Sequence, residues 1–107
     1  MSLLATCTLA LHMECFNFRP HIEVTFHHHV NIERACQIDG ASACAKHYKD
    51  RCEIWLPIPK RYGNYSIGDA MRHERLHCKG WDHDPDDHEG RGEWFPIKYP
   101  KGWTVSE

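Results

Sequence analysis

Residues 67–83 read IGDAMRHERLHCKGWDH and contain the main helix that the sequence predicts. Ser66 stands at the helix start with Asp69 three residues on, which is the acidic form of a capping box. Gly80 ends the pattern, because glycine accepts the left-handed turn that commonly closes a helix. We therefore expect a helix over residues 66–79. Its helix-compatible apolar positions are Ile67, Ala70, Met71 and Leu76.

The same stretch holds His73, Glu74, His77, Gly80 and His83 in the order H-E-x-x-H-x-x-G-x-x-H. Residues four apart lie on one face of a helix, so His73 and His77 can present their imidazoles to a single ion. The turn at Gly80 can bring His83 back as a third nitrogen ligand. Three protein ligands leave a fourth position for water, as in catalytic zinc sites. The spacing predicts one Zn²⁺ per chain, bound by these three histidines.

Other interpretations of the histidines remain open. The chain has ten histidines, and this number raises the odds of a chance match. His83 could be an ordinary exposed histidine, with Asp82, Asp84 or His88 completing the site. The run His27 to His29 alternates between the two faces of an expected strand, which favours a solvent-facing role for it.

The motif resembles the extended zinc signature of the metzincin-type metallopeptidases, within the broader zincin class. The resemblance covers residues 73–83 and implies that Glu74 is the general base of peptide hydrolysis. Metzincins also have a methionine turn beneath the metal, and no Met follows Met71 here. The expectation is therefore a minimal zincin-like metallopeptidase acting on a peptide or protein. The candidate oxyanion stabilisers are Tyr65, His88 and Arg91, with Tyr62 and Tyr99 as further candidates.

A second resemblance is to the bacterial rRNA-maturation endoribonucleases, whose tris-histidine motif runs H-G-x-x-H-x-x-G-Y-D-H. Residues 80–84, GWDHD, are similar to its second half. Those enzymes have glycine where this chain has Glu74, and they work in the cytosol. A zinc-dependent endoribonuclease is thus one alternative function. A zinc-stabilised interaction module without catalysis is another, and chelation would unfold such a module.

Length and charge limit the remaining possibilities. A chain of 107 residues is long enough for one domain, residues 1–107, with a single modest core. Its net charge of −2 weighs against a nucleic-acid partner, because nucleic-acid affinity comes largely from neutralising phosphates. The apolar start over residues 3–11 is too short for a transmembrane segment and is either the remnant of an export signal or a first strand.

The six cysteines predict disulfides rather than a zinc ribbon, since none forms a C-x-x-C pair. Six cysteines allow 15 complete pairings. Cys78 is expected to tie the main helix to the region of residues 36–52. Disulfides indicate an oxidising compartment, hence a periplasmic or secreted protein; free thiols in a cytosolic protein are the alternative. The six are Cys7, Cys15, Cys36, Cys44, Cys52 and Cys78.

The rest of the chain predicts a short twisted sheet. Residues 21–30 alternate as a strand with Ile22, Val24 and Phe26 on a buried face, and a short helix follows from Asn31 to Gly40. Residues 41–52 are either helix or a disulfide-tied loop. Residues 52–59 form a strand that lies at a sheet edge or ends at its prolines; such an edge could bind an extended substrate.

The stretch after Gly80 has little periodicity and predicts a long irregular C-terminal segment, in which Trp94 and other aromatic residues anchor the chain on the core. Together these elements predict the α+β fold class, as a small zincin-like domain: a short twisted sheet, the active-site helix 66–79 and the C-terminal segment.

Overall fold

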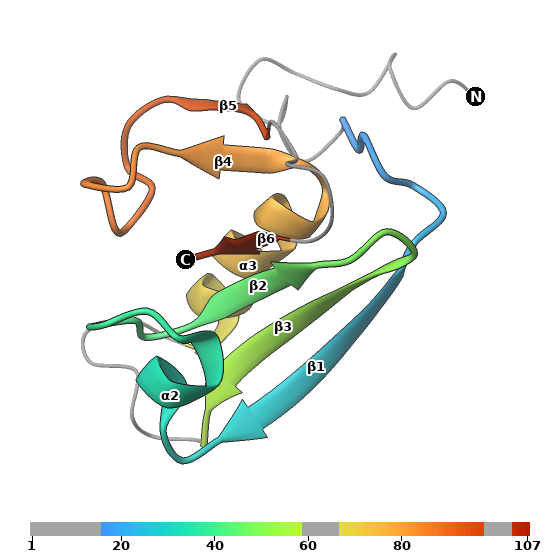
Figure 1. Ribbon diagram of the computed structural model, residues 1–107. Coiled ribbons are helices and arrows are strands. Elements are labelled where there is room, and N and C mark those ends of the chain that lie inside the picture. The colour runs from blue at the N-terminus through green and yellow to red at the C-terminus, as the bar shows by residue number, and fades with distance from the viewer. Residues whose placement is uncertain (1–15, 59–66, 98–103) are drawn as a thin grey trace.

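Four strands form the main sheet in the order β1-β3-β2-β6 (Figure 1). They are β1 (Glu23–His29), β2 (Cys44–His47), β3 (Arg51–Pro57) and β6 (Thr104–Ser106). β1 runs parallel to β3, whereas β2 is antiparallel to both β3 and β6. The computed structural model describes residues 16–58, 67–97 and 104–107. Its elements belong to the α+β class, as the sequence predicts.

β3 is an inner strand and does not lie at an edge. β1 pairs with all of it, and β2 pairs with residues 52–55 on the other side. The strand ends at Pro57, so the missing N–H of proline falls where the strand stops. The sequence predicts that this strand either lies at a sheet edge or ends at its prolines. The second alternative is correct. β3 has no free edge along residues 52–55 for a peptide to pair with, and that part of the substrate-binding expectation is wrong.

The prediction of a buried face on β1 is wrong for two of its three residues. Val24 remains 39% exposed and Phe26 36% exposed, while Ile22 packs against the core. β1 is the outer strand of the sheet, so the helix packed on β2 and β3 does not cover it fully. On its other side His27 stacks on Trp55 with the ring centroids 4.5 Å apart, so this histidine is more than a solvent-facing side chain.

Two helices cover opposite faces of the sheet. The five-residue helix α2 (Ile32–Cys36) begins at Asn31, whose side-chain oxygen accepts a hydrogen bond from the Arg34 N–H. It ends before Gly40, because Gln37 already adopts the left-handed conformation, with φ +58°. The helix α3 (Ile67–Cys78) matches the prediction for residues 66–79, although Ser66 lies outside the described residues.

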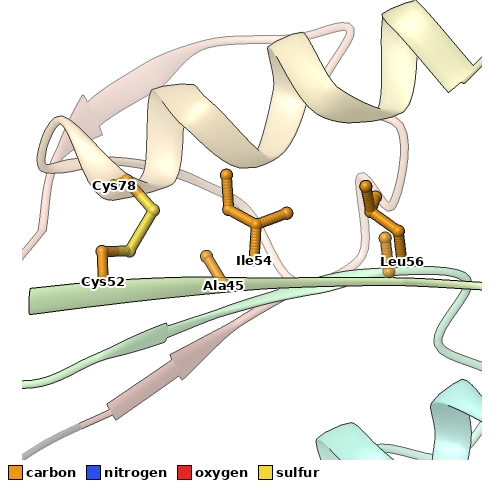
Figure 2. Packing of buried hydrophobic residues seen from close by; sticks show 6 residues of the cluster. Ala45, Cys52, Ile54, Leu56 and Cys78 are labelled. Atoms are coloured by element: carbon orange, nitrogen blue, oxygen red, sulfur yellow. A yellow bond between two sulfur atoms is a disulfide. The ribbon is translucent and has the colours of Figure 1, made fainter. Parts of the chain in front are cut away.

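A disulfide holds each helix to the sheet. Cys52–Cys78 joins β3 to the end of α3, as expected for Cys78, and Cys36–Cys44 joins α2 to β2. Figure 2 shows α3 above the sheet, with Ile54, Leu56 and Ala45 filling the space between them. The apolar contacts of α2 lie on the opposite face. Cys7 and Cys15 lie outside the described residues.

The sequence prediction fails most clearly in two segments. Residues 41–52, expected as helix or loop, contain β2, which the sheet stabilises by pairing on both sides. The segment after Gly80 is not irregular throughout. It forms β4 (Trp81–His83) and β5 (Trp94–Pro96), which pair antiparallel, and it returns as β6 to the main sheet. Figure 1 shows β6 between β2 and β4, beside α3.

One property of the described chain bears on where the protein works. Its two disulfides are compatible with an extracellular or periplasmic location. None of the helices in residues 16–58, 67–97 and 104–107 has the length and apolar character needed to cross a membrane.

Candidate metal centre

Three histidines converge where α3 meets β4. His73 and His77 stand one turn apart on α3, and Gly80, with φ +105°, turns the chain so that β4 presents His83. The Nε2 atom of His73 lies 3.2 Å from that of His77 and 3.0 Å from that of His83. Nitrogen atoms bound to one tetrahedral zinc lie about 3.3 Å apart, given Zn–N bonds of about 2.0–2.1 Å. The group could hold a metal ion.

Main-chain carbonyls fix the orientation of the rings. Nδ1 of His77 donates a hydrogen bond to the Trp81 carbonyl at 2.9 Å, and Nδ1 of His83 donates to the Asp84 carbonyl at 3.0 Å. A neutral imidazole with its proton on Nδ1 has a bare lone pair on Nε2, the form that binds a metal. His73 has a backbone hydrogen bond with Glu89 as well.

Burial keeps two of these rings neutral. It lowers the pKa of His77 well below its usual value, and the neighbouring charge of His73 adds to the effect. Burial also lowers the pKa of His73, with a smaller contribution from His83. Neutral imidazoles are ready to bind a cation without first losing a proton.

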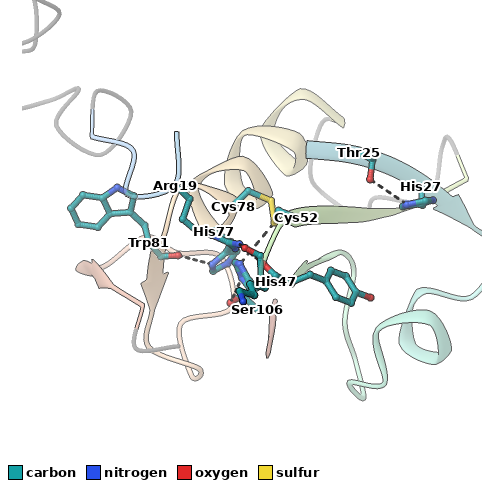
Figure 3. The surroundings of a disulfide bond; sticks show 11 residues. Arg19, Thr25, His27, His47, Cys52, His77, Cys78, Trp81 and Ser106 are labelled. Carbon is teal, nitrogen blue, oxygen red and sulfur yellow. Dashed lines mark hydrogen bonds between the residues drawn. A yellow bond between two sulfur atoms is a disulfide. The ribbon is translucent and has the colours of Figure 1, made fainter. Parts of the chain in front are cut away.

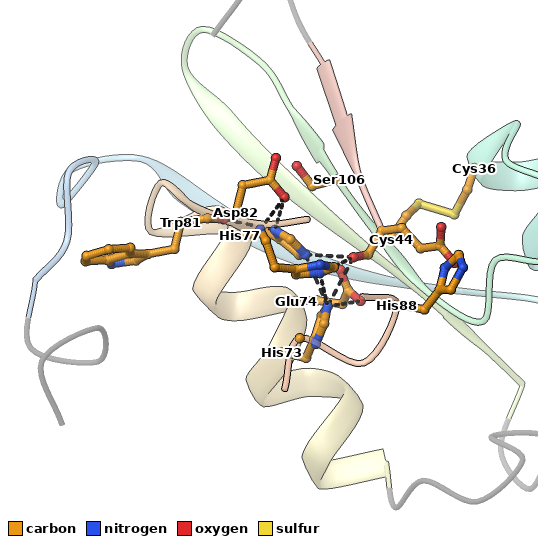
Figure 4. Close-up of polar contacts among 12 residues, drawn as sticks. Cys36, Cys44, His73, Glu74, His77, Trp81, Asp82, His88 and Ser106 are labelled. Carbon is orange, nitrogen blue, oxygen red and sulfur yellow. Dashed lines mark hydrogen bonds and ion pairs between the residues drawn. A yellow bond between two sulfur atoms is a disulfide. The ribbon is translucent and has the colours of Figure 1, made fainter. Parts of the chain in front are cut away.

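Glu74 lies beside the triad as a buried carboxyl. It is 3% exposed, and its Oε2 atom lies 4.0 Å from Nε2 of His73 (Figure 4). Its Oε1 atom has no hydrogen-bond partner among the described residues. Burial raises the pKa of Glu74 well above the usual value, and the charges of Glu107 and Asp82 raise it further. A buried polar atom without a partner is costly, so this oxygen has the character of a functional group rather than a structural one.

A fourth polar atom occupies the centre, and no feature of the sequence indicated it. The main-chain oxygen of Glu107 lies 2.7 Å from Nε2 of His77, 3.0 Å from that of His83 and 3.1 Å from that of His73. This main-chain oxygen cannot donate, and the Nε2 atoms of His77 and His83 carry lone pairs rather than protons. Lone pairs at these distances repel one another unless a cation lies between them. The donor set therefore fits a bound metal ion.

Trp94 is a second residue that the sequence did not place at the site. Its ring centroid lies 5.1 Å from that of His73, 5.2 Å from His77 and 4.7 Å from His83. Its Nε1–H donates to the Gly90 carbonyl at 2.7 Å. The pairing of His83 with Trp94 between β4 and β5 brings the indole there. Only this strand register, which the sequence does not reveal, could have identified it.

A cavity of about 520 Å³ opens beside the triad. Its wall includes His73 and Glu74 from α3, His88 and Glu89 from the loop after β4, and Glu107. The candidate base therefore borders a space large enough for part of a peptide.

Of the other predicted site residues that the structure describes, some lie at the site and others do not. His88 lines the cavity, with Nδ1 3.5 Å from the Glu107 Oε1 atom. Arg91 has a side chain that is 82% exposed and ion-pairs with Glu89, so it is not brought to the triad. Asp82 lies 3.6 Å from Nδ1 of His77, on the side of the ring away from the shared centre. Tyr62, Tyr65 and Tyr99 lie outside the described residues.

Comparisons of this chain with protein-family models, with curated proteins and with solved structures find no match in any of the three. The candidate site is therefore interpreted from its own geometry and chemistry.

Proposed function

We propose that His73, His77 and His83 bind one Zn²⁺ ion, and that the protein is a small zincin-like metallopeptidase with Glu74 as its general base. The observation that supports this most is that Nε2 of His73 lies 3.2 Å from Nε2 of His77 and 3.0 Å from Nε2 of His83, beside the buried carboxyl of Glu74, whose Oε1 has no partner among the described residues. Imidazole nitrogens in a tetrahedral arrangement suit zinc. The location proposed is periplasmic or secreted, in keeping with the disulfides.

Different residues of the chain would have different roles in the proposed hydrolysis. Held by the three histidines, a zinc ion would supply Lewis acidity that activates water and polarises a carbonyl. The Glu74 carboxylate accepts the proton of the attacking water and passes it to the leaving amine. A nearby cation favours the ionised form of this carboxyl and so opposes the effect of burial on its pKa. Of the two predicted oxyanion donors among the described residues, His88 lines the cavity wall, whereas Arg91 is exposed.

The test is to compare Glu74→Gln with the wild-type protein after zinc loading, using a peptide library as substrate. We expect Glu74→Gln to keep zinc and to lose hydrolysis by a factor of about 10² or more, since only the base is removed. Glu89→Gln is the matched control, because Glu89 is an exposed carboxylate on the same cavity wall. Full hydrolysis by Glu74→Gln, or equal losses in the two variants, would contradict the assignment of the base.

A second candidate function is a zinc-stabilised module without catalysis. The observation that favours it is the main-chain oxygen of Glu107, which lies within 3.1 Å of all three Nε2 atoms. With this oxygen as a fourth ligand the metal site is closed, as structural zinc sites are. In that case chelation should unfold the protein, and no peptide in the library should be cleaved.

A further inference from the structure

We propose that residues 104–107 are a blocking segment: they occupy the metal site as a peptide substrate would, and the site opens when β6 leaves β2. This inference rests on the proposed function, because it explains how a catalytic site and a closed coordination shell can belong to one protein. It also identifies the edge of β2 as the place where an extended peptide would bind.

The segment is held by strand pairing. β6 pairs antiparallel with β2, with Ala45 opposite Ser106 and Lys46 opposite Val105. The buried Ser106 hydroxyl is hydrogen-bonded to Nε2 of His47 at 3.0 Å (Figure 3). α3 packs on both β3 and β2, and the chain paired with the outer edge of β2 reaches the triad. Strand pairing is a general way for a sheet edge to hold an extended peptide.

The last residue of the segment contacts each part of the candidate site. Its main-chain oxygen lies 2.7–3.1 Å from the three Nε2 atoms, at the corner where a substrate carbonyl or a water would sit. Its side-chain Oε1 lies 3.5 Å from Nδ1 of His88. Glu107 also forms part of the cavity wall beside Glu74. One residue thus fills the fourth corner and engages the candidate oxyanion donor.

The attachment is small enough to be reversible. β6 has three residues and lies at the outer side of the sheet, where it pairs only with β2 among the described strands. A strand of this length contributes few hydrogen bonds, and edge strands open more easily than central ones. Once β6 leaves, β2 presents the same edge to another chain. A peptide replacing it would run antiparallel to β2 with a carbonyl at the metal.

The experiment measures access to the metal rather than catalysis. The protein is loaded with Co²⁺, whose visible spectrum reports its ligands, and is titrated with acetohydroxamate. Ser106→Pro removes a backbone donor and the hydroxyl bonded to His47, and so should detach the segment. We expect acetohydroxamate to bind this variant about tenfold or more tightly than wild type, because the open state no longer has to be populated first. Ser106→Ala keeps the strand but loses the hydroxyl, so its affinity for acetohydroxamate should lie between those of wild type and Ser106→Pro.

Binding kinetics in the wild-type protein provide a test that does not depend on a variant folding. If the segment must leave first, the observed rate of acetohydroxamate binding reaches a plateau as its concentration rises. A linear rise without a plateau, or equal affinity in wild type and a folded Ser106→Pro, would overturn the inference. Tighter binding by Ser106→Pro with no peptide cleavage by any form would support the blocking segment and contradict the proposed peptidase.

Discussion

The rings of His77 and His83 are each oriented by one main-chain carbonyl, which is the second-shell arrangement that metal-binding histidines commonly have. The two carbonyls belong to Trp81 and Asp84, next to the turn at Gly80. The same turn therefore brings His83 to the site and sets the tautomer of two candidate ligands. Second-shell hydrogen bonds of this kind commonly change metal affinity by about 10–100-fold.

Gly90 is expected to matter for the same site, because it lets Trp94 pack against the imidazoles. Its φ is +65°, and an added Cβ would lie 2.3 Å from Cζ2 of Trp94 and 3.0 Å from Cε1 of His73. We expect Gly90→Ala to cost about 2 kcal/mol or more of stability and to weaken zinc binding about tenfold. Gly40→Ala is the matched control, since Gly40 has φ +78° with no atom within 4 Å of the added Cβ.

Chemical denaturation and chelator competition measure the two effects in both glycine variants. Gly40→Ala should show the cost of the left-handed backbone alone, about 1 kcal/mol, with unchanged zinc affinity. Equal changes in zinc affinity for the two variants would show that the indole does not support the ligands.

His47 makes the stability of the metal-free protein depend on pH. Burial, together with the charge of Arg19, lowers the pKa of His47 from 6.5 to about 4. In the unfolded chain His47 is therefore protonated below about pH 6.5, whereas in the folded chain it is protonated only below about pH 4. The contribution of His47 to the free energy of unfolding is complete above pH 6.5. It decreases as the pH falls from 6.5 to about 4, by up to about 3 kcal/mol.

Urea denaturation at pH 7 and pH 4.5, with zinc removed, measures this loss. His73 and His77 act in the same direction, because burial also lowers the pKa of each. The contribution of His47 is therefore obtained by comparing the loss of stability between pH 7 and pH 4.5 in wild type and in His47→Gln, because glutamine does not titrate in this range. An identical pH dependence in both proteins would be evidence against a buried neutral His47.

At the scale of elements, α3 carries two of the three candidate ligands and the candidate base, and its position depends on β3. The Cys52–Cys78 bond fixes the end of this helix directly after His77. The Cys36–Cys44 bond instead joins α2 to β2. The two bonds should therefore differ in their effect on the metal site.

We expect Cys52→Ala/Cys78→Ala to lower the free energy of unfolding by about 3.5 kcal/mol and to weaken zinc binding. The sequence separation of 26 sets this value through the loop closed in the unfolded chain. The matched pair Cys36→Ala/Cys44→Ala closes a separation of 8 and should cost about 2.5 kcal/mol, with little change in zinc affinity. Denaturation and chelator competition test both double variants. The opposite ranking in zinc affinity would contradict the role given to α3.

The elements also show which parts of the fold the sequence could reveal. α3 was predictable because its apolar positions and its closing glycine act locally. β1 was predictable as a strand from its alternation, although Val24 and Phe26 on the face expected to be buried are exposed. β2 was missed because residues 44–47 gain their stability from pairing with β3 and β6, which lie elsewhere in the chain. The edge position of β1 was missed for the same reason, since strand order is a property of the assembled sheet.

At the scale of the whole molecule, the candidate site is assembled from parts of the chain that are far apart. The motif at residues 73–83 provides three nitrogens and a carboxyl, and these were predictable because helix geometry and one turn bring them together. Trp94 and the Glu107 oxygen arrive by strand pairing, at β4–β5 and β2–β6. Local spacing could therefore predict the ligands, but neither the indole against them nor the fourth oxygen.

The most direct measurement of the central claim is the metal content of the purified protein after exposure to zinc and removal of the excess. Elemental analysis should find about one zinc per chain in the wild-type protein and in His88→Ala, whose side chain lies at the cavity wall outside the triad. His83→Ala should lose most of it, because two imidazoles remain. Absence of zinc from the wild type, or full retention by His83→Ala, would contradict a metal centre built on His73, His77 and His83.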